Sequence, residues 1–227
     1  MTLRLAIPSK GRLQEQAIDW FAARGVTIRR VGSGREYAGV VDGLEGVELA
    51  LLSAGEIPRE LEAGRVHVGV TGRDLIREKL HDWDAKVREL APLGFGFADL
   101  VVAVPDPWVD VETLDDLDEV AAQFRARHCH RLRVATKYHR LVRNFFRKQG
   151  VADWRIVDSQ GATEGTIANE TAEIIADITT TGETLTANHL RILEDGLILK
   201  SEAILVESLR ADAPQDTLAA LRAKLGV

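Results

Sequence analysis

The sequence predicts an α/β protein in which the sheet is largely parallel. Short apolar runs rich in β-branched residues alternate along the 227 residues with segments whose apolar side chains recur at helical spacing. Hydrophobic residues make up 45% of the chain and charged residues 28%, a balance typical of a chain that folds around a packed core. Glycine, proline and polar clusters separate the runs, so the elements can be placed in order.

The first half of the chain predicts a strand, a helix and then a series of short elements. A strand is expected over Leu3–Ile7, and a helix over Leu13–Ala23, where apolar residues share one face. Gly25 ends this helix, as glycine commonly does. The remaining elements are strands at Val26–Val31 and Val66–Val70, a hairpin of Tyr37–Val41 and Val47–Leu52 around Asp42-Gly43, and helices at Ile57–Ala63 and from Thr71 to Leu80.

The second half continues the alternation. Val101–Val104 is a strongly apolar strand that stops at Pro105, and Thr113 is placed to cap an acidic helix. The other expected strands are Leu132–Ala135, Arg155–Val157, Ile174–Ile178, Leu190–Leu193, Ile198–Leu199 and Ala203–Val206, and the other expected helices are Arg140–Gln149, a short one within Gly161–Glu170, and Leu218–Leu225.

Two interruptions of this pattern predict two lobes. Gly94 and Gly96 mark one crossing, and a second falls between Thr184 and Leu190. Lobe I is therefore expected to contain residues 1–94 and 190–227, and lobe II residues 95–189. Two crossings between two α/β lobes make a hinge, with a cleft expected between the lobes.

The composition excludes several classes of protein. A net charge of −6 argues against a nucleic-acid coat and against an anionic membrane surface. The single cysteine, Cys129, permits no internal disulfide, and its neighbours His128 and His130 are too close in sequence to converge on one metal ion. Neither a signal peptide nor a membrane-spanning stretch is found, which predicts a cytoplasmic protein.

The most informative segment follows the predicted strand Ile174–Ile178. It is an acid followed by a bend rich in threonine and glycine, which can hold a phosphate with backbone N–H groups and hydroxyls. If a helix begins near its end, the helix dipole adds attraction for an anion. The predicted sugar-phosphate residues here are Asp177, Thr179, Thr180, Thr181, Gly182, Glu183 and Thr184. A plain strand–turn–helix junction would also tolerate these residues.

Other strand ends carry polar residues that favour anion recognition, because ligands of open α/β sheets gather at carboxyl ends of strands. Each also has an ordinary interpretation as a solvated loop, a helix cap or a surface side chain. The candidates are Lys10, Gly11 and Arg12 after the first strand, Arg35 in a glycine-rich stretch, Thr71 and Gly72, Lys137 and Tyr138, and Glu164. No nucleophilic triad, G-x-x-x-x-G-K-[ST] or G-x-G-x-x-G motif is present. The pattern therefore favours group transfer by positioning and charge stabilisation over covalent catalysis.

Taken in order, these segments resemble ATP phosphoribosyltransferase, the first enzyme of histidine biosynthesis, over nearly the whole chain. The matching stretches are IPSKGRL (Ile7–Leu13), GVTGRDL (Gly69–Leu75), LRVATKY (Leu132–Tyr138), GATEG (Gly161–Gly165) and ADITTTGETLTANHL (Ala176–Leu190). The chain is similar to the short form, which has no appended regulatory domain. It departs from the family at Ser53, where arginine is frequent in Arg-x-x-Asp-Ile-Pro, and at Ala162, where Gly-Ser-x-Glu is usual.

The resemblance implies a two-lobed fold like that of type II periplasmic binding proteins, and a reaction in which N1 of ATP attacks C1 of phosphoribosyl pyrophosphate. It implies Mg²⁺, carried mainly by the substrate with no dedicated protein ligand set, and a regulatory subunit resembling histidyl-tRNA synthetase around a homodimer. Arg12 and Arg35 are expected to be catalytic. The threonine bend, with Glu164 and Asp177, is expected to bind the phosphoribosyl group, and Lys10, Gly11, Thr71, Gly72, Lys137 and Tyr138 to bind ATP or pyrophosphate. The alternatives are a non-catalytic solute-binding protein with the same two lobes, and the sensing domain of a regulator.

Overall fold

The chain divides into two compact units, each built on its own sheet. The computed structural model describes residues 2–30 and 38–227. The first unit takes the described residues up to Phe97 and those from Ser201 onwards, and the second contains Ala98–Lys200. The sequence placed these boundaries after residues 94 and 189. The second boundary differs because β11 (Leu190–Ser201) is one long strand of the second sheet.

The first unit contains a seven-stranded sheet with the order β2-β3-β4-β1-β5-β12-β6. Its strands are β1 (Leu3–Pro8), β2 (Thr27–Arg30), β3 (Ala38–Asp42), β4 (Val47–Leu52), β5 (Val68–Gly72), β6 (Val87–Pro92) and β12 (Ala203–Ser208). Only the central strands β4, β1 and β5 run parallel, and the outer pairings are antiparallel. The sheet is therefore mixed, and the expectation of a largely parallel sheet holds only for its centre.

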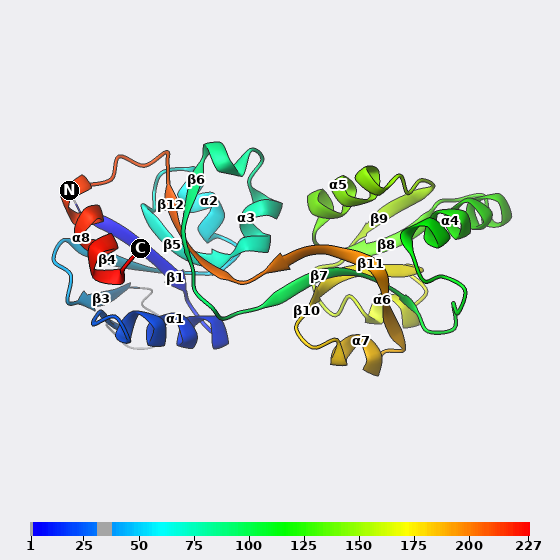
Figure 1. Ribbon diagram of the computed structural model, residues 1–227, viewed down its shortest axis with the longest axis horizontal. Coiled ribbons are helices and arrows are strands. Elements are labelled where there is room, and N and C mark those ends of the chain that lie inside the picture. The colour runs from blue at the N-terminus through cyan, green and yellow to red at the C-terminus, as the bar shows by residue number, and fades with distance from the viewer. Residues whose placement is uncertain (1, 31–37) are drawn as a thin grey trace. The chain divides into compact units, whose positions relative to one another are not determined.

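Helices cover both faces of this sheet because its strands are apolar on both sides. Leu5 of β1 belongs to the core beneath α1 (Arg12–Ala22) and α8 (Gln215–Leu225), whereas the next residue, Ala6, faces α2 (Ile57–Glu62) and α3 (Arg73–Lys79). Figure 1 shows α1 on one side of the sheet and α2 and α3 on the other. Both Leu5 and Ala6 are fully buried. Burial of each leucine side chain contributes about 1.5–3 kcal/mol to folding.

The second unit contains a five-stranded sheet with the order β11-β7-β10-β8-β9. Its remaining strands are β7 (Ala98–Pro105), β8 (Leu132–Thr136), β9 (Trp154–Asp158) and β10 (Ile174–Thr179). The strands β10, β8 and β9 are parallel, and β7 runs antiparallel to β10. The carboxyl ends of three neighbouring strands therefore meet at one edge of this sheet.

The helices between Ala98 and Lys200 cover both faces of the second sheet (Figure 1). On one face, α4 (Leu114–His128) and α5 (His139–Gln149) bury the larger core, which includes Phe146 and Val134. On the other face, the short helices α6 (Gly165–Ala168) and α7 (Glu183–Ala187) cover a smaller core around Ile175.

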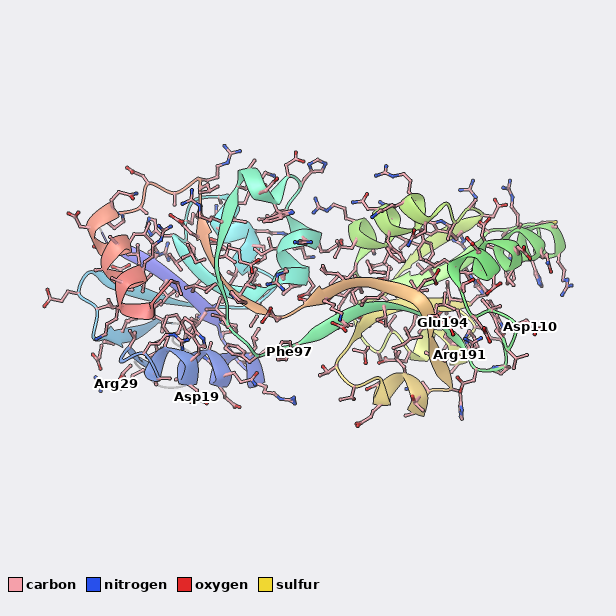
Figure 2. All side chains as sticks on the ribbon, viewed as in Figure 1. Asp19, Arg29, Phe97, Asp110, Arg191 and Glu194 are labelled. Atoms are coloured by element: carbon pink, nitrogen blue, oxygen red, sulfur yellow. The ribbon has the colours of Figure 1, made fainter. Side chains whose placement is uncertain are left out.

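The start of α4 is fixed by a cap and by β11. As predicted, Thr113 caps the helix: its hydroxyl accepts from the Asp116 N–H (3.3 Å), and the Asp116 carboxylate accepts from the Thr113 N–H (2.8 Å). On β11, Arg191 donates to two carbonyls of the loop before α4, and the Glu194 N–H donates to the carbonyl of Glu112 (3.0 Å; Figure 2). The strand β11 itself runs without interruption through Gly196, where the sequence predicted a break.

The other differences from the predicted elements have local causes. The sequence missed β6, whose residues Val87–Pro92 alternate only weakly between apolar and polar, and the 3₁₀ turn η1 (Trp83–Ala85). The predicted hairpin has a four-residue connection, 43–46, with Gly43 and Gly46 at positive φ. Cys129 is exposed at the end of α4. Among the described residues, none of the helices has the length and apolar character to span a bilayer.

Candidate active site

The bend after β10 is held by its own threonines. The Gly182 N–H donates to Thr179 Oγ1 (2.9 Å), and the Glu183 N–H donates to Thr181 Oγ1 (3.4 Å). Gly182 has φ +79°, a left-handed conformation that glycine adopts without strain. The Thr186 hydroxyl donates to the Gly182 carbonyl (3.2 Å). The apolar strand, the left-handed glycine and these hydroxyls together set the shape of the bend.

A polar pocket of about 210 Å³ opens on this bend. It is lined by Ala98, Glu164, Ile178, Thr179, Thr180, Thr181, Thr184 and Leu185. The structure thus brings Glu164, from the start of α6, beside the four threonines that the sequence had grouped with it only by resemblance. The apolar residues of the lining were not predicted, and nothing in their sequence pattern distinguishes them from core positions.

Asp177 lies just before the bend, with 13% of its side chain exposed. Its carboxylate accepts from the Ile178 N–H (2.8 Å) and lies 3.5 Å from Lys137 Nζ. Lys137 follows β8, which is the parallel neighbour of β10, so the pairing of the strands brings the two residues together. A partly exposed pair of this kind contributes at most about 1 kcal/mol to stability. Its importance is that a cation stands beside the predicted sugar-binding carboxylate.

Two neighbouring side chains face the core. Tyr138 is only 2% exposed and packs in the main core of the second unit, so the prediction that its ring meets a base is not supported by its position. Thr163 is fully buried, and its hydroxyl lies 3.2 Å from the Ser159 hydroxyl. Thr163 therefore does not present its hydroxyl in place of the serine that Ala162 replaces.

In the first unit, the loop after β1 presents two cations. Lys10 and Arg12 are exposed, and within the described residues neither side chain makes an ion pair. Gly11, which lies between them, has φ +76° and ψ −177°, a conformation essentially restricted to glycine. Its carbonyl accepts from the N–H groups of Gln14 (2.9 Å) and Glu15 (3.3 Å) and so begins α1. Arg35, the other predicted catalytic arginine, lies outside the described residues.

The loops after β4 and β5 lie at the same edge, because these strands flank β1 in parallel. Thr71 is fully buried, and its hydroxyl donates to the Ala54 carbonyl (2.8 Å), so it ties the two loops together and is not available to a ligand. A larger residue than glycine does not fit at position 72, because its Cβ would lie 2.3 Å from Asp74 Oδ1. Asp74 is itself held by the Ser201 hydroxyl (2.8 Å).

Ser53, the departure from the family pattern, has a structural partner. Its N–H and its hydroxyl donate to Glu56 Oε2 at 3.0 and 2.8 Å, at the start of α2. These hydrogen bonds, that of the hydroxyl first, lower the pKa of the Glu56 carboxyl below its ordinary value. The pair therefore holds the turn that leads into α2, at the position where the family often has arginine.

Two α/β units, each with parallel central strands and polar loops at their carboxyl ends, define the class of type II periplasmic-binding-protein-like folds. The chain is similar to a structure described as a periplasmic transporter, with a TM-score of 0.54 and 14% identity, over 99% of this chain and 82% of that chain. It is more similar to the ATP phosphoribosyl transferase (HisG:HisZ) complex from Thermotoga maritima, with a TM-score of 0.74 and 22% identity, over 99% of this chain and 97% of that chain. At these identities the likeness shows the fold.

Sequence comparison identifies the family. Residues 53–226 match the model of HisG, ATP phosphoribosyltransferase. The chain is 65% identical to ATP phosphoribosyltransferase from Cereibacter sphaeroides, over all of this chain and 97% of that protein. It is 55% identical to ATP phosphoribosyltransferase from Rhodopseudomonas palustris (strain BisB18), over 96% of this chain and 67% of that protein. The chain belongs to the ATP phosphoribosyltransferase family, whose members catalyse the first step of histidine biosynthesis, and its match is to the short form.

Proposed function

We propose that the threonine-lined pocket of the second unit binds the 5-phosphate and the ribose of phosphoribosyl pyrophosphate. The observation that carries this proposal is the position of Glu164 beside the threonines around one pocket of about 210 Å³. Threonine hydroxyls and backbone N–H groups donate to phosphate oxygens, whereas a carboxylate accepts from ribose hydroxyls. Asp177, next to the bend, is the second such acceptor.

The loop Lys10-Gly11-Arg12 of the first unit, together with Arg35, is proposed to neutralise the phosphates of ATP and the leaving pyrophosphate. Lys10 and Arg12 are exposed cations, and neither is paired with a carboxylate of residues 2–30 or 38–227. A guanidinium binds phosphate oxygens in a bidentate manner, which suits a group whose charge grows during the reaction. In this scheme Thr71 and Gly72 hold the neighbouring loops in place, and Lys137 supports Asp177.

The reaction requires positioning more than covalent participation by the protein. The bond from C1 of the ribose to the pyrophosphate oxygen breaks, and a bond from C1 to N1 of the adenine forms. Positive charge develops on the ribose ring beside the carboxylates, and negative charge develops on pyrophosphate beside the arginines. A preorganised contact to developing charge contributes about 3 kcal/mol to lowering the barrier, which is roughly a hundredfold in rate.

Mg²⁺ is proposed to reach the site on the pyrophosphate. In the described part of the chain, no group of three or more His, Cys, Asp or Glu side chains is arranged to hold a metal ion. Glu164 and Asp177 offer single carboxylates, which fits an ion that keeps waters and phosphate oxygens as most of its ligands. The ion would supply charge neutralisation at the leaving group.

We also propose that the enzyme acts in the cytoplasm, where ATP is available, as a homodimer within a hetero-oligomer. The regulatory partner is expected to resemble histidyl-tRNA synthetase. Support comes from the similarity to a chain described as part of a HisG:HisZ complex.

The proposed function is tested by following pyrophosphate release from ATP and phosphoribosyl pyrophosphate, with and without the regulatory subunit. Calorimetric titration with phosphoribosyl pyrophosphate then tests the pocket. Glu164→Gln is expected to weaken this binding at least tenfold, whereas Glu119→Gln, at an exposed position of α4, leaves it unchanged. Equal affinities for the two variants would exclude Glu164 from the donor site, and binding without pyrophosphate release would favour a non-catalytic binding protein.

A further inference from the structure

Strand β9 forms one edge of the second sheet. It pairs in parallel with β8, and in the described part of the chain no strand pairs with its other side. The backbone carbonyl of Asp153 accepts from the Leu132 N–H (2.9 Å), and the Ser159 N–H donates to the Thr136 carbonyl (3.1 Å), so the odd-numbered residues bond towards β8. In a parallel pair the direction alternates with each residue. The backbone N–H and C=O groups of Trp154, Ile156 and Asp158 therefore point outwards.

A broad groove of about 760 Å³ runs along this edge between β9 and α5. Trp154 and Ile156 contribute to its lining. The Trp154 ring packs against Phe146 with ring centroids 4.8 Å apart, and its indole N–H donates to the Val151 carbonyl (3.0 Å). The lining at this point is thus apolar and anchored to the core, beside outward-facing backbone groups.

The groove is positively charged in a chain of net charge −6. Arg131, Arg143 and Arg155 line it, are exposed, and make no ion pair with any described residue. Its two acids are already engaged, Asp158 with His139 (2.8 Å) and Asp153 with Arg125. The helix above the groove, α5, carries four Lys or Arg residues and no carboxylate. Charged residues on an edge strand can serve only to prevent aggregation. That role would not require the neighbouring helix, α5, to lack carboxylates as well.

We propose that this groove, β9 with α5, is the docking site for an extended acidic segment of the regulatory subunit, which adds to the sheet as a sixth strand. The outward backbone groups of β9 supply main-chain hydrogen bonds, as in other cases of strand addition. Side chains of an added strand alternate in direction, so every second one faces α5. Carboxylates at those alternate positions meet Arg143 and Arg131, and this charge complementarity identifies the occupant as acidic. The inference rests on the regulatory subunit of the proposed function.

The experiment measures binding of the regulatory subunit by calorimetry at about 0.1 M salt. The triple variant R131Q/R143Q/R155Q is expected to raise Kd at least tenfold and to flatten its dependence on salt. The matched control R59Q/K79Q/R127Q removes the same charge at exposed positions and should change Kd less than twofold. Among the described residues these three side chains form no ion pair. Ile156→Pro removes one outward N–H without changing charge or the ladder to β8, and is expected to weaken binding comparably. Pyrophosphate release by the variants without the partner should equal that of the wild type.

Unchanged affinity in the triple variant and in Ile156→Pro would overturn the groove as the docking site, while leaving the partner assignment intact. A wild-type chain that does not bind the regulatory subunit would remove both the partner assignment and the groove. The self-association of each variant is followed by sedimentation, since a change there would make this edge a contact between copies of the chain and would also overturn the proposal.

Discussion

The loop after β1 and the bend after β10 both connect a strand to a helix, but they carry different side chains. Each follows a strand of a parallel centre, contains a glycine at positive φ and leads into a helix. The first loop carries two exposed cations, Lys10 and Arg12, and the second carries only neutral hydroxyls between its strand and Gly182. In the first loop the cationic side chains extend into solvent, whereas in the second the hydroxyls are bonded to the backbone of the bend itself.

This difference matches the two halves of the proposed reaction. A phosphate that stays attached to the ribose needs fixed donors, because its charge does not change. A leaving pyrophosphate gains charge, so cations contribute more in the transition state than in the ground state. The comparison predicts that changes in the first loop act mainly on turnover, and that changes in the bend act mainly on binding of the sugar phosphate.

The largest effect is expected for Arg12→Ala. Loss of a cation at the developing charge should lower kcat about a hundredfold, with little change in the urea midpoint, because Arg12 is exposed and unpaired in the described structure. Arg59→Ala, at an exposed position of α2, is the matched control and should retain activity. A kcat of Arg12→Ala within threefold of the wild type would contradict the catalytic role, and the same assay on Arg35→Ala tests the other predicted arginine.

The next effect concerns Gly182. A β-branched residue at φ +79° is strained by roughly 1–2 kcal/mol or more, so Gly182→Val should distort the bend and weaken phosphoribosyl pyrophosphate binding at least tenfold. Gly150→Val is a close control, since Gly150 has φ +81°, equally open surroundings, and a position at the end of α5. Both variants should lose similar stability, but only the first should lose affinity in calorimetry. Equal affinities would mean that the bend does not bind the donor.

A smaller effect is expected for Thr179→Val, which removes the hydrogen bond to the Gly182 N–H (2.9 Å). Such a bond contributes about 0.5–1.5 kcal/mol, so the affinity for the donor should fall several-fold, and Thr179→Ser should restore it. Thr171→Val removes an exposed hydroxyl bond to the Thr166 carbonyl (3.1 Å) and serves as the control. If the serine variant fails to restore binding, the methyl group matters more than the hydroxyl.

The sequence was informative about these loops because glycine, threonine and charged residues at strand ends have few structural substitutes. The sequence predicted the strand that ends near Asp177 and the bend around Gly182. It also predicted the helix cap at Thr113. The sequence could not show that Tyr138 is buried whereas Lys137 is partly exposed. Successive residues at the end of a strand face opposite sides, and only packing decides which of them faces the core. For the same reason Thr71 was predicted to bind a ligand, although its hydroxyl is buried against Ala54.

Long-range pairing explains the remaining differences. The mixed order of the first sheet depends on β12 entering between β5 and β6, more than a hundred residues after either strand. No local pattern contains that information. The Ser53–Glu56 pair, by contrast, is local: a serine is followed three residues later by an acid in the turn before α2, so the pair could have been found from the sequence.

The same comparison extends to pH. Hydrogen bonds from Ser53 lower the pKa of Glu56 in the folded chain, so the carboxylate binds fewer protons there than in the unfolded chain. Its contribution to stability is therefore present above the unfolded pKa and is lost as the pH falls through the folded pKa. The bend of the second unit is held by neutral hydroxyls, whose hydrogen bonds do not titrate in this range.

Ser53→Ala should accordingly lower the free energy of unfolding slightly at pH 7, by at most about 1 kcal/mol for an exposed hydrogen bond to a carboxylate, and by less as the pH approaches 4 and below. The destabilisation by Thr179→Val should stay constant over the same range. Urea midpoints of the wild type and the two variants, measured at intervals from pH 7 to about pH 3, separate these outcomes. The difference in urea midpoint from the wild type could depend on pH for Thr179→Val, or stay constant for Ser53→Ala. Either result would show that the first unit does not use a charge-assisted turn where the second uses a neutral one.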